Sequence, residues 1–330
     1  MQTWSDLQST QPLASKIMMN SLKRNRISHA YLIQGSRGTG KKTFAMLLAM
    51  TLLCEQRQAI EPCQRCNTCK RIMSGNHPDV HWIEPEGRTI RNEQIDLLRK
   101  EFVYTGLETS KKMYIISGAE ALTVNAANRI LKFLEEPDME TTAILLTDNG
   151  QSIIPTIRSR CQIIDLKPLD QRAFQHRLMN LESETISENN ARLLSALTNN
   201  IDDAIQYHQA ETIYRVRDVV SELIYELLVQ YEQRYLFVHQ KWLPQLTDRK
   251  EQELGLDLLI IAIKDIVHFQ MGRENHTFLF QSGDGLLQRA VNQFPQKRLL
   301  QMLKDLLQAR QKMNQNVHPT LVMEQLVLQF

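Results

Sequence analysis

The sequence carries almost no net charge, few aromatic residues and no long apolar run. Lysine and arginine number 39 against 37 acidic residues, so no global field attracts nucleic acid or an anionic membrane. Aromatic residues make up 6% of the chain and form no stacking platform, which argues against base-specific readout. No apolar stretch approaches the roughly 20 residues of a membrane span. The first ten residues are polar, unlike a signal peptide. We therefore expect a cytoplasmic protein.

Glycine and proline are scarce in the second half of the chain. Eight of the 12 glycines precede residue 151, and residues 151–254 contain none. Seven of the 10 prolines occur by Pro168. Since these residues punctuate regular structure, we expect strands, turns and helices in the first half and mostly helices in the second. The 330 residues suffice for two or three domains.

Against this background, one glycine-rich stretch has the layout of a phosphate-binding loop. An apolar strand at 31–33 leads into a turn, a lysine and an apolar helix at 44–53. The spacing from Gly35 to Gly40 and Lys41 matches the G-x-x-x-x-G-K pattern, in which backbone N–H groups surround phosphates at a helix N-terminus. The candidate nucleotide-binding residues are Gly35, Gly38, Gly40, Lys41, Lys42 and Thr43.

The residues that would hold magnesium are missing. The position after Lys41 should be serine or threonine but is Lys42, whose ammonium has no lone pair for a metal. The apolar strand that begins near Lys111 should end in acidic residues, but Ser117 and Gly118 stand there. Glu120 is expected on the following turn, pointing elsewhere. We therefore expect weak or absent ATP binding and no efficient hydrolysis.

Four of the five cysteines are closely spaced. Cys54, Cys63, Cys66 and Cys69 follow a C-x8-C-x2-C-x2-C pattern, which suits one tetrahedral structural zinc ion per chain with no open position. In a cytoplasmic protein they are not expected to form disulfides. An iron–sulfur cluster or four unligated thiols are the alternatives. His77 and His81 lie nearby, but four thiolates leave them no role as ligands.

Apolar residues at helical spacing predict further helices. In the first half these cover residues 13–24, 89–102 and 122–136, and a buried strand is predicted at 143–147. The apolar face of the third helix comprises Val124, Ala127, Ile130, Leu131 and Leu134. In the second half the predicted helices cover 172–179, 188–197, a segment starting near 202, and then 213–235, 254–269, 299–313 and 319–330.

Taken together, these motifs resemble bacterial clamp-loader subunits of the AAA+ family, which belong to DNA polymerase III. The matching segments are residues 29–33, the loop, the four-cysteine insert, residues 128–137 and the triplet Ser159-Arg160-Cys161. The resemblance covers residues 29–161, and beyond residue 165 it rests on helical composition alone.

The resemblance implies a fold and a domain division. The fold is α/β: a RecA-like parallel sheet with helices on both faces, a zinc-binding insert, a small helical lid and an all-helical C-terminal collar. The implied domains are a nucleotide-binding-like domain at 1–166 with the insert at about 54–72, the lid at 167–210, and the collar, an oligomerisation domain, at 211–330.

The resemblance also implies a role for one arginine. In a ring of loader subunits, the arginine of Ser-Arg-Cys reaches the neighbour's ATP site, and Arg160 takes that place here. Capping a strand or pairing with a local acid is the alternative for Arg160, and Arg158 is a rival finger. Hydrolysing loaders carry a lid arginine in a Ser-x-Arg-Asp-Ala pattern. This chain has Asp202 at that position, where a carboxylate would repel phosphate, and a solvated helix residue is the alternative for Asp202.

On this interpretation the chain is a non-hydrolysing subunit of the sliding-clamp loader in the DNA polymerase III holoenzyme, a DNA-directed DNA polymerase (nucleotidyltransferase). Its partners are the tau/gamma ATPase subunits and the delta subunit and, through them, the sliding clamp and primed DNA. The chain alone is not expected to be catalytic. Two alternatives stay open: a loader ATPase that hydrolyses in cis, and a zinc-dependent nucleic-acid module on a remnant ATPase scaffold.

Overall fold

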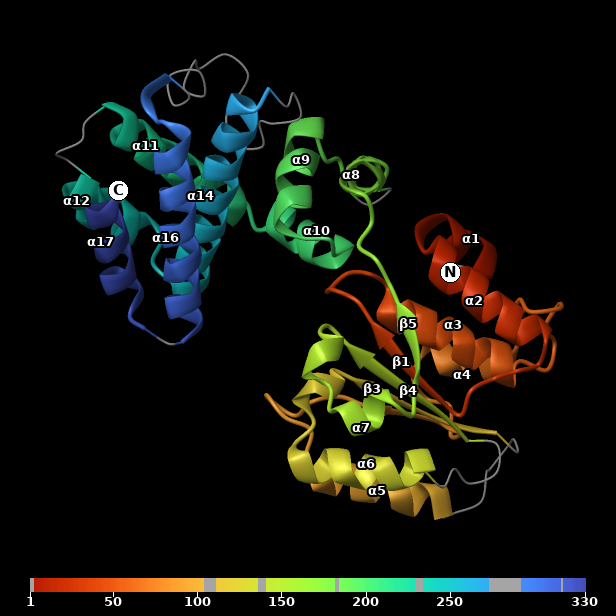
Figure 1. The fold of residues 1–330 in the computed structure, drawn as a ribbon. Helices are drawn as coiled ribbons and strands as arrows, with labels where there is room; N and C mark the ends of the chain where they lie inside the picture. The colour runs from red at the N-terminus through yellow and green to blue at the C-terminus, as the bar shows by residue number, and fades with distance from the viewer. Residues whose placement is uncertain are drawn as a thin grey trace. The chain divides into compact units, whose positions relative to one another are not determined.

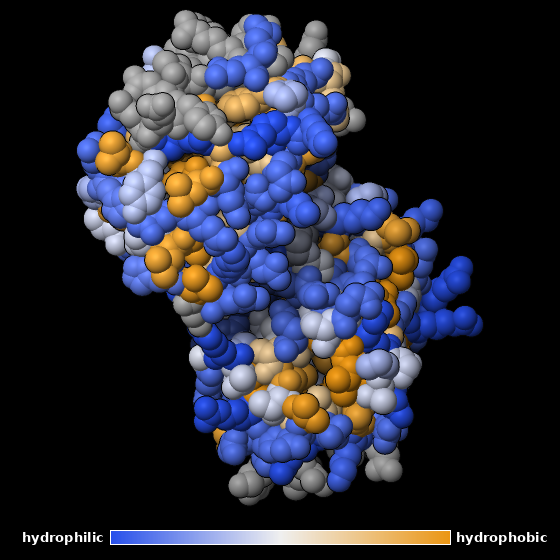
Figure 2. Space-filling model, turned by 60° about the vertical axis from the view of Figure 1, so that its left-hand side comes forward, coloured by the Kyte–Doolittle hydropathy of each residue, from blue (hydrophilic) through white to orange (hydrophobic). Residues whose placement is uncertain are grey.

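The structure, a computed structural model, describes residues 3–103, 111–135, 141–181, 184–229, 234–272, 292–315 and 317–330. The chain divides into two compact units, Met1–Leu169 and Asp170–Phe330. The finer division into three domains stays a prediction. Among the described residues, no helix combines the length and the apolar character needed to cross a membrane. On the face drawn in Figure 2, hydrophobic residues form small groups among hydrophilic ones.

The first unit is built on a parallel sheet of five strands in the order β2-β3-β4-β1-β5. The strands are β1 (Ala30–Gln34), β2 (Val80–Ile83), β3 (Lys112–Ser117), β4 (Thr141–Thr147) and β5 (Gln162–Asp165). Every neighbouring pair is parallel. All the strands therefore end at the same side of the sheet, which we call the carboxyl edge. The predicted α/β fold with a parallel sheet is confirmed.

Helices cover both faces of this sheet (Figure 1). One face packs on α1 (Trp4–Thr10), α2 (Pro12–Lys23), α3 (Lys41–Leu53) and α4 (Asn67–Met73), and the other on α5 (Asn92–Val103), α6 (Val124–Glu135) and α7 (Pro155–Arg158). Because side chains alternate along a strand, Tyr31 and Ile33 of β1 belong to the first core, whereas Ala30 and Leu32 belong to the second.

The N-terminal helix α1 was not predicted, because its sequence is polar. Its start is a capping box, in which the Thr3 side chain accepts from the Asp6 backbone N–H and the Asp6 carboxylate accepts from the Thr3 backbone N–H. Trp4 is fully buried, and its ring meets the Phe44 ring edge-on with centroids 5.2 Å apart. A single large aromatic residue thus anchors a helix that has little other apolar surface.

Two helix predictions in this unit needed adjustment. Helix α5 begins at Asn92 rather than residue 89, because Glu86 and Thr89 pair in a short antiparallel bridge. In α6, Ile130 and Leu134 are buried as predicted, but Val124, the first residue of the helix, is 74% exposed. The first turn of α6 therefore lies outside the core.

All the regular secondary structure in the described part of the second unit is helical. Its elements are α8 (Gln171–Met179), α9 (Glu188–Leu197), α10 (Ile201–Gln209), α11 (Thr212–Val229), α12 (Arg234–Phe237), the π-helical segment η3 (Val238–Trp242), α13 (Leu243–Gln245), α14 (Arg249–Gln270), α16 (Gln296–Asn314) and α17 (Pro319–Gln329). Within the segment predicted as a helix over 213–235, the structure describes α11 up to Val229 and the start of α12 at Arg234, and residues 230–233 lie outside the described residues. Helix α14 begins five residues before the predicted 254.

The core of the second unit includes one close approach between a ring and a backbone. Trp242, the last residue of η3, is fully buried. A Cβ at Gly255 on α14 would lie 2.6 Å from Cη2 and 2.8 Å from Cζ2 of the Trp242 ring. Gly255 is therefore needed because it has no side chain, although glycine costs about 1 kcal/mol in a helix interior relative to alanine.

We predict that Gly255→Ala destabilises the protein. Helix propensity alone would stabilise it by about 1 kcal/mol, whereas overpacking a close-packed core typically costs about 1–3 kcal/mol. We expect the clash to dominate, with a lower midpoint of urea unfolding. Lys264→Ala, at an exposed position of the same helix, is the control and should leave the midpoint nearly unchanged. A stabilised Gly255→Ala variant would contradict the packing described here.

Candidate functional site

The predicted phosphate loop connects β1 to α3 at the carboxyl edge. Gly38 and Gly40 have φ angles of 85° and 87°, a left-handed conformation that glycine adopts without strain. Gly40 is the N-cap of α3. A Cβ at Gly35 would lie 2.4 Å from the Leu166 carbonyl oxygen, so the chain after β5 presses against the start of the loop. Backbone conformation or close contact thus explains why glycine occupies each of these three positions.

Gln11, between α1 and α2, ties this loop to its surroundings. Its side-chain amide donates to the carbonyls of Thr39 (3.3 Å) and Lys167 (2.7 Å), and its Oε1 accepts from the Lys167 N–H (3.0 Å). The residue is 4% exposed. Gln11 therefore joins the N-terminal helices, the loop and the chain after β5. Nothing in its local sequence marks it, since its partners lie 28 and 156 residues away.

The side chain of Lys41 folds back onto its own loop. Its Nζ donates to the carbonyl oxygens of Gly35 (2.6 Å) and Ser36 (2.9 Å) and forms an ion pair with Asp148 Oδ1 at 2.6 Å. Asp148 directly follows β4 and was not predicted as part of the site. It is brought to the loop because β4 and β1 are neighbours in the sheet.

Lys42 points to a different partner. Its Nζ lies 2.6 Å from Glu84 Oε1, and Glu84 directly follows β2. Both side chains are more than half exposed, so this pair contributes little to stability. Thr43, the remaining predicted loop residue, lies half-buried in the first turn of α3.

The end of β3 carries neither acid nor base. Ser117 is its last residue, and Gly118 follows with a φ of 70°. A Cβ at Gly118 would also lie 3.2 Å from the Pro85 ring, so a glutamate there would be strained. Glu120 does approach the loop region, contrary to the expectation that it points elsewhere: its Oε1 accepts from the Asp148 N–H at 3.4 Å.

The four cysteines predicted as metal ligands lie together. Their sulfur atoms are all within 4.8 Å of one another, with Cys54 Sγ 3.5 Å from Cys63 Sγ and 3.9 Å from Cys66 Sγ. Four thiolates at about 2.3 Å from one ion lie about 3.8 Å apart. The spacing therefore fits a tetrahedral metal site, and it is far longer than a disulfide bond of about 2.05 Å.

Backbone N–H groups around the cysteines support thiolate charge. The amides of Cys63, Cys66 and Cys69 point at the sulfurs of Cys54, Cys63 and Cys66, respectively, at 3.3–3.4 Å. Hydrogen bonds from the backbone of Arg65 and Cys66 lower the pKa of Cys63 to about 6, whereas burial raises the pKa values of Cys54 and Cys69. Within the described residues, the only group of this kind that could hold a metal is these four cysteines, and His77 instead accepts from the Asp79 N–H.

The cysteine insert is joined to the N-terminal helix. The Glu61 carboxylate accepts from the N–H groups of Trp4 (3.1 Å) and Ser5 (3.3 Å) in the first turn of α1. The indole N–H of Trp4 donates to Thr51 Oγ1 on α3 at 2.9 Å. A structured insert thus holds α1 against the helix that follows the phosphate loop.

The predicted finger Arg160 contacts its own domain. Its guanidinium lies 2.6 Å from Glu135 Oε1 at the end of α6 and donates to the Thr156 carbonyl at 2.9 Å. The side chain remains 35% exposed. Arg158, the rival, donates to Gln151 Oε1 at 2.9 Å. Both arginines thus contact residues of their own domain, and the role of Arg160 as an arginine finger in a neighbouring subunit stays a prediction.

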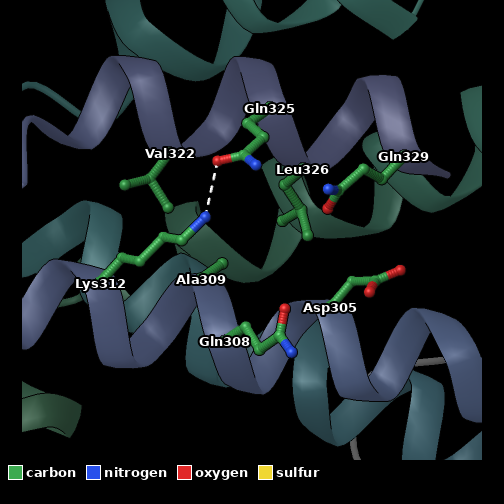
Figure 3. Close-up of a pocket in the computed structure, with 8 residues that line it drawn as sticks. All are labelled: Asp305, Gln308, Ala309, Lys312, Val322, Gln325, Leu326 and Gln329. Carbon is green, nitrogen blue, oxygen red and sulfur yellow. Dashed lines mark hydrogen bonds between the residues drawn. The ribbon is translucent and has the colours of Figure 1, made fainter.

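Asp202, at the position of the expected lid arginine, lies in the first turn of α10. A carboxylate there is favoured by the helix dipole, so the residue has a local structural reason. In the second unit, a shallow pocket lies between α16 and α17, and Lys312 Nζ donates to Gln325 Oε1 at 2.8 Å across it (Figure 3). Its polar lining of Asp305, Gln308, Lys312, Gln325 and Gln329 indicates no catalytic constellation.

The strand order and the glycine loop after β1 define the first unit as having an AAA+-type fold. The chain is 40% identical to DNA polymerase III subunit delta' of Bacillus subtilis (strain 168) over 330 residues, which is 99% of this chain and 98% of that protein. The chain therefore belongs to the family of DNA polymerase III delta-prime subunits.

Other comparisons agree with this assignment. The family described as "DNA polymerase III, delta subunit" matches residues 10–170, and "DNA polymerase III, delta subunit, C terminal" matches 240–330. Subunit tau of Escherichia coli (strain K12) is 34% identical over 196 residues, 59% of this chain and 30% of that protein. A solved gamma subunit-related protein from Thermotoga maritima shares the fold, with a TM-score of 0.50, 16% identity, and coverage of 94% of this chain and 97% of that one. The resemblance read from the motifs is confirmed.

We predict that Cys161, the fifth cysteine, is unreactive in the folded protein. Burial raises its thiol pKa to about 12, so at pH 8 its thiolate fraction is about a thousandfold below that of an ordinary cysteine of pKa about 8.5. Because the folded protein favours the neutral thiol, Cys161 does not lower the free energy of unfolding at pH values below its ordinary pKa of about 8.5. As the pH rises from there toward 12, the free energy of unfolding falls. Iodoacetamide labelling at pH 8, read by peptide mapping, should be slow in native protein and fast in urea. Equal rates would contradict the burial.

Proposed function

We propose that this chain is a sliding-clamp loader subunit that does not hydrolyse ATP and that lends Arg160 to the ATP site of a neighbouring subunit. The proposed absence of ATP hydrolysis is supported by the side chains that lie at the carboxyl edge. Lys42 stands where a metal-binding hydroxyl is expected and pairs with Glu84, and β3 ends at Ser117 and is followed by Gly118.

These positions lack the groups that ATP hydrolysis needs. Magnesium takes oxygen ligands, and an ammonium cannot replace them. Activating the attacking water needs a positioned side chain, whereas Gly118 has none and its φ of 70° disfavours gaining one. ATP binding by this chain alone is therefore weak or absent under the proposal.

The exposure and position of Arg160 support the finger role. A guanidinium offered to a neighbour's γ-phosphate offsets charge that develops in phosphoryl transfer. Arg160 keeps 35% of its side-chain surface exposed while Glu135 and Thr156 hold it. Exchanging Glu135 for a phosphate would replace one anion by another with more charge, so the local ion pair is compatible with a role in trans.

The proposed partners are the tau/gamma ATPase subunits and the delta subunit of the loader, and through them the sliding clamp and primed DNA. The second unit offers apolar surface for such contacts, since several leucines on its last two helices are exposed. These are Leu300 and Leu307 on α16, and Leu321 and Leu328 on α17, all between 49% and 71% exposed. Large contiguous apolar patches mark protein–protein interaction sites, and these four leucines are the candidates for such a surface.

Zinc is the metal we propose for the four cysteines. A set of four sulfur donors at tetrahedral spacing is typical of structural zinc, and it leaves no position for a substrate. When bound, the ion would cross-link the insert, whose Glu61 caps α1. The metal's role is therefore to hold the insert and the N-terminal helix in place, not to take part in a reaction.

We predict about one zinc per chain in purified protein, measured by elemental analysis. Cys63→Ser or Cys66→Ser should lose the metal and lower the thermal unfolding temperature, because the ligand set becomes incomplete. Cys161→Ser, which changes the one cysteine outside the cluster, is the matched control and should keep the zinc. A zinc content near zero in every sample, or iron in its place, would refute the assignment.

We predict that Arg160→Ala lowers ATP turnover by the assembled loader while this chain stays folded. Losing an arginine finger costs about 10³–10⁵ in rate at the dependent site, so total turnover should fall by that site's share. Arg158→Ala, two residues away, is the control and should leave turnover near wild type. Arg160→Lys should rescue little, because lysine cannot make bidentate contacts. Unchanged turnover with Arg160→Ala would remove the finger role.

A further inference from the structure

The phosphate-loop lysine has no hydrogen-bond donor to spare. A lysine ammonium has three N–H donors, and Lys41 Nζ has three close acceptors: Gly35 O at 2.6 Å, Ser36 O at 2.9 Å and Asp148 Oδ1 at 2.6 Å. The Lys41 side chain is only 12% exposed. A phosphate that approached this loop would therefore have to displace one of the three acceptors.

Asp148 is the acceptor that can leave. The Gly35 and Ser36 carbonyls belong to the loop itself, whereas the Asp148 side chain is 52% exposed and can rotate into solvent. The backbone at Asp148, by contrast, is held in place by hydrogen bonds. The preceding Thr147 carbonyl accepts from the Gly35 N–H at 3.2 Å, and the Asp148 N–H donates to Glu120 at 3.4 Å. The chain thus holds a movable carboxylate next to the loop.

We propose that Asp148 is an internal competitor of nucleotide phosphate for Lys41, an autoinhibitory contact that keeps Lys41 from binding phosphate and that we call the Asp148 latch. A carboxylate is an anion that accepts hydrogen bonds from an ammonium as a phosphate oxygen does. While Asp148 is engaged, it both occupies the lysine and repels an incoming phosphate. This inference rests on the proposed weak nucleotide binding and names the group that causes part of it.

Two variants that each remove one negative charge distinguish the Lys41–Asp148 contact from the overall electrostatic field at the carboxyl edge. Asp148→Asn keeps the shape of the side chain and removes its charge. Asp165→Asn removes one charge at the same carboxyl edge without freeing Lys41, because Asp165 ends β5 and accepts from Gln34. ATP is titrated into the full chain by calorimetry, in EDTA and again in magnesium. We expect Asp148→Asn to tighten ATP binding about fivefold, or about 1 kcal/mol, and Asp165→Asn to change it less than twofold.

The outcomes decide the proposal. Equal gains in the two variants would mean that only the net charge of the edge matters, and the latch would be wrong. No gain in Asp148→Asn, including a failure of both variants to bind ATP, would also overturn it. The loader assay with Arg160→Ala tests the proposed function separately: a dependence on Arg160 together with an inert Asp148→Asn would reject the latch alone.

Discussion

The structure of the first unit depends on the placement of β1 between β4 and β5. The residues of β1 are almost completely buried and divide the two cores, with alternate side chains entering opposite faces. Pairing on both edges fixes where β1 stops, and so fixes where the glycine loop starts. The same pairing carries Asp148 from β4 and Leu166 from the end of β5 to that loop. The surroundings of Gly35 and Lys41 are thus decided by strands that lie more than 100 residues away in sequence.

Charge at the carboxyl edge follows from this geometry. Glu84, Asp148 and Asp165 come from three different strand ends, and parallel strands bring such ends together. Lys41 and Lys42 each meet one of these carboxylates. In a nucleotide-binding protein, such a loop presents its cations to phosphate. Here both lysines form ion pairs with carboxylates of the protein itself. The proposed loss of hydrolysis and the proposed latch are two consequences of the same arrangement.

A second set of contacts links the N-terminal segment to both candidate sites. Gln11 bonds the loop and the chain after β5, whereas Glu61 of the cysteine insert caps α1 and Trp4 packs against Phe44 of α3. The insert, the N-terminal helices and the phosphate-loop helix therefore support one another. In this arrangement a structural metal would act on the loop only through the packing of these elements.

Much of this protein could be predicted from local patterns. The glycine loop, the cysteine spacing and most of the helices follow from spacing and propensity, because these depend on residues a few positions apart. Helix α1 was not predicted, since it is stabilised by the burial of Trp4 against α3, which lies far away in the sequence. The sequence by itself determined that the loop and the four-cysteine insert exist and that the magnesium ligands are replaced. Only the tertiary structure decided which acids meet Lys41 and Lys42 and which one holds Arg160, because those pairings depend on strand order and helix packing rather than on neighbours in the chain.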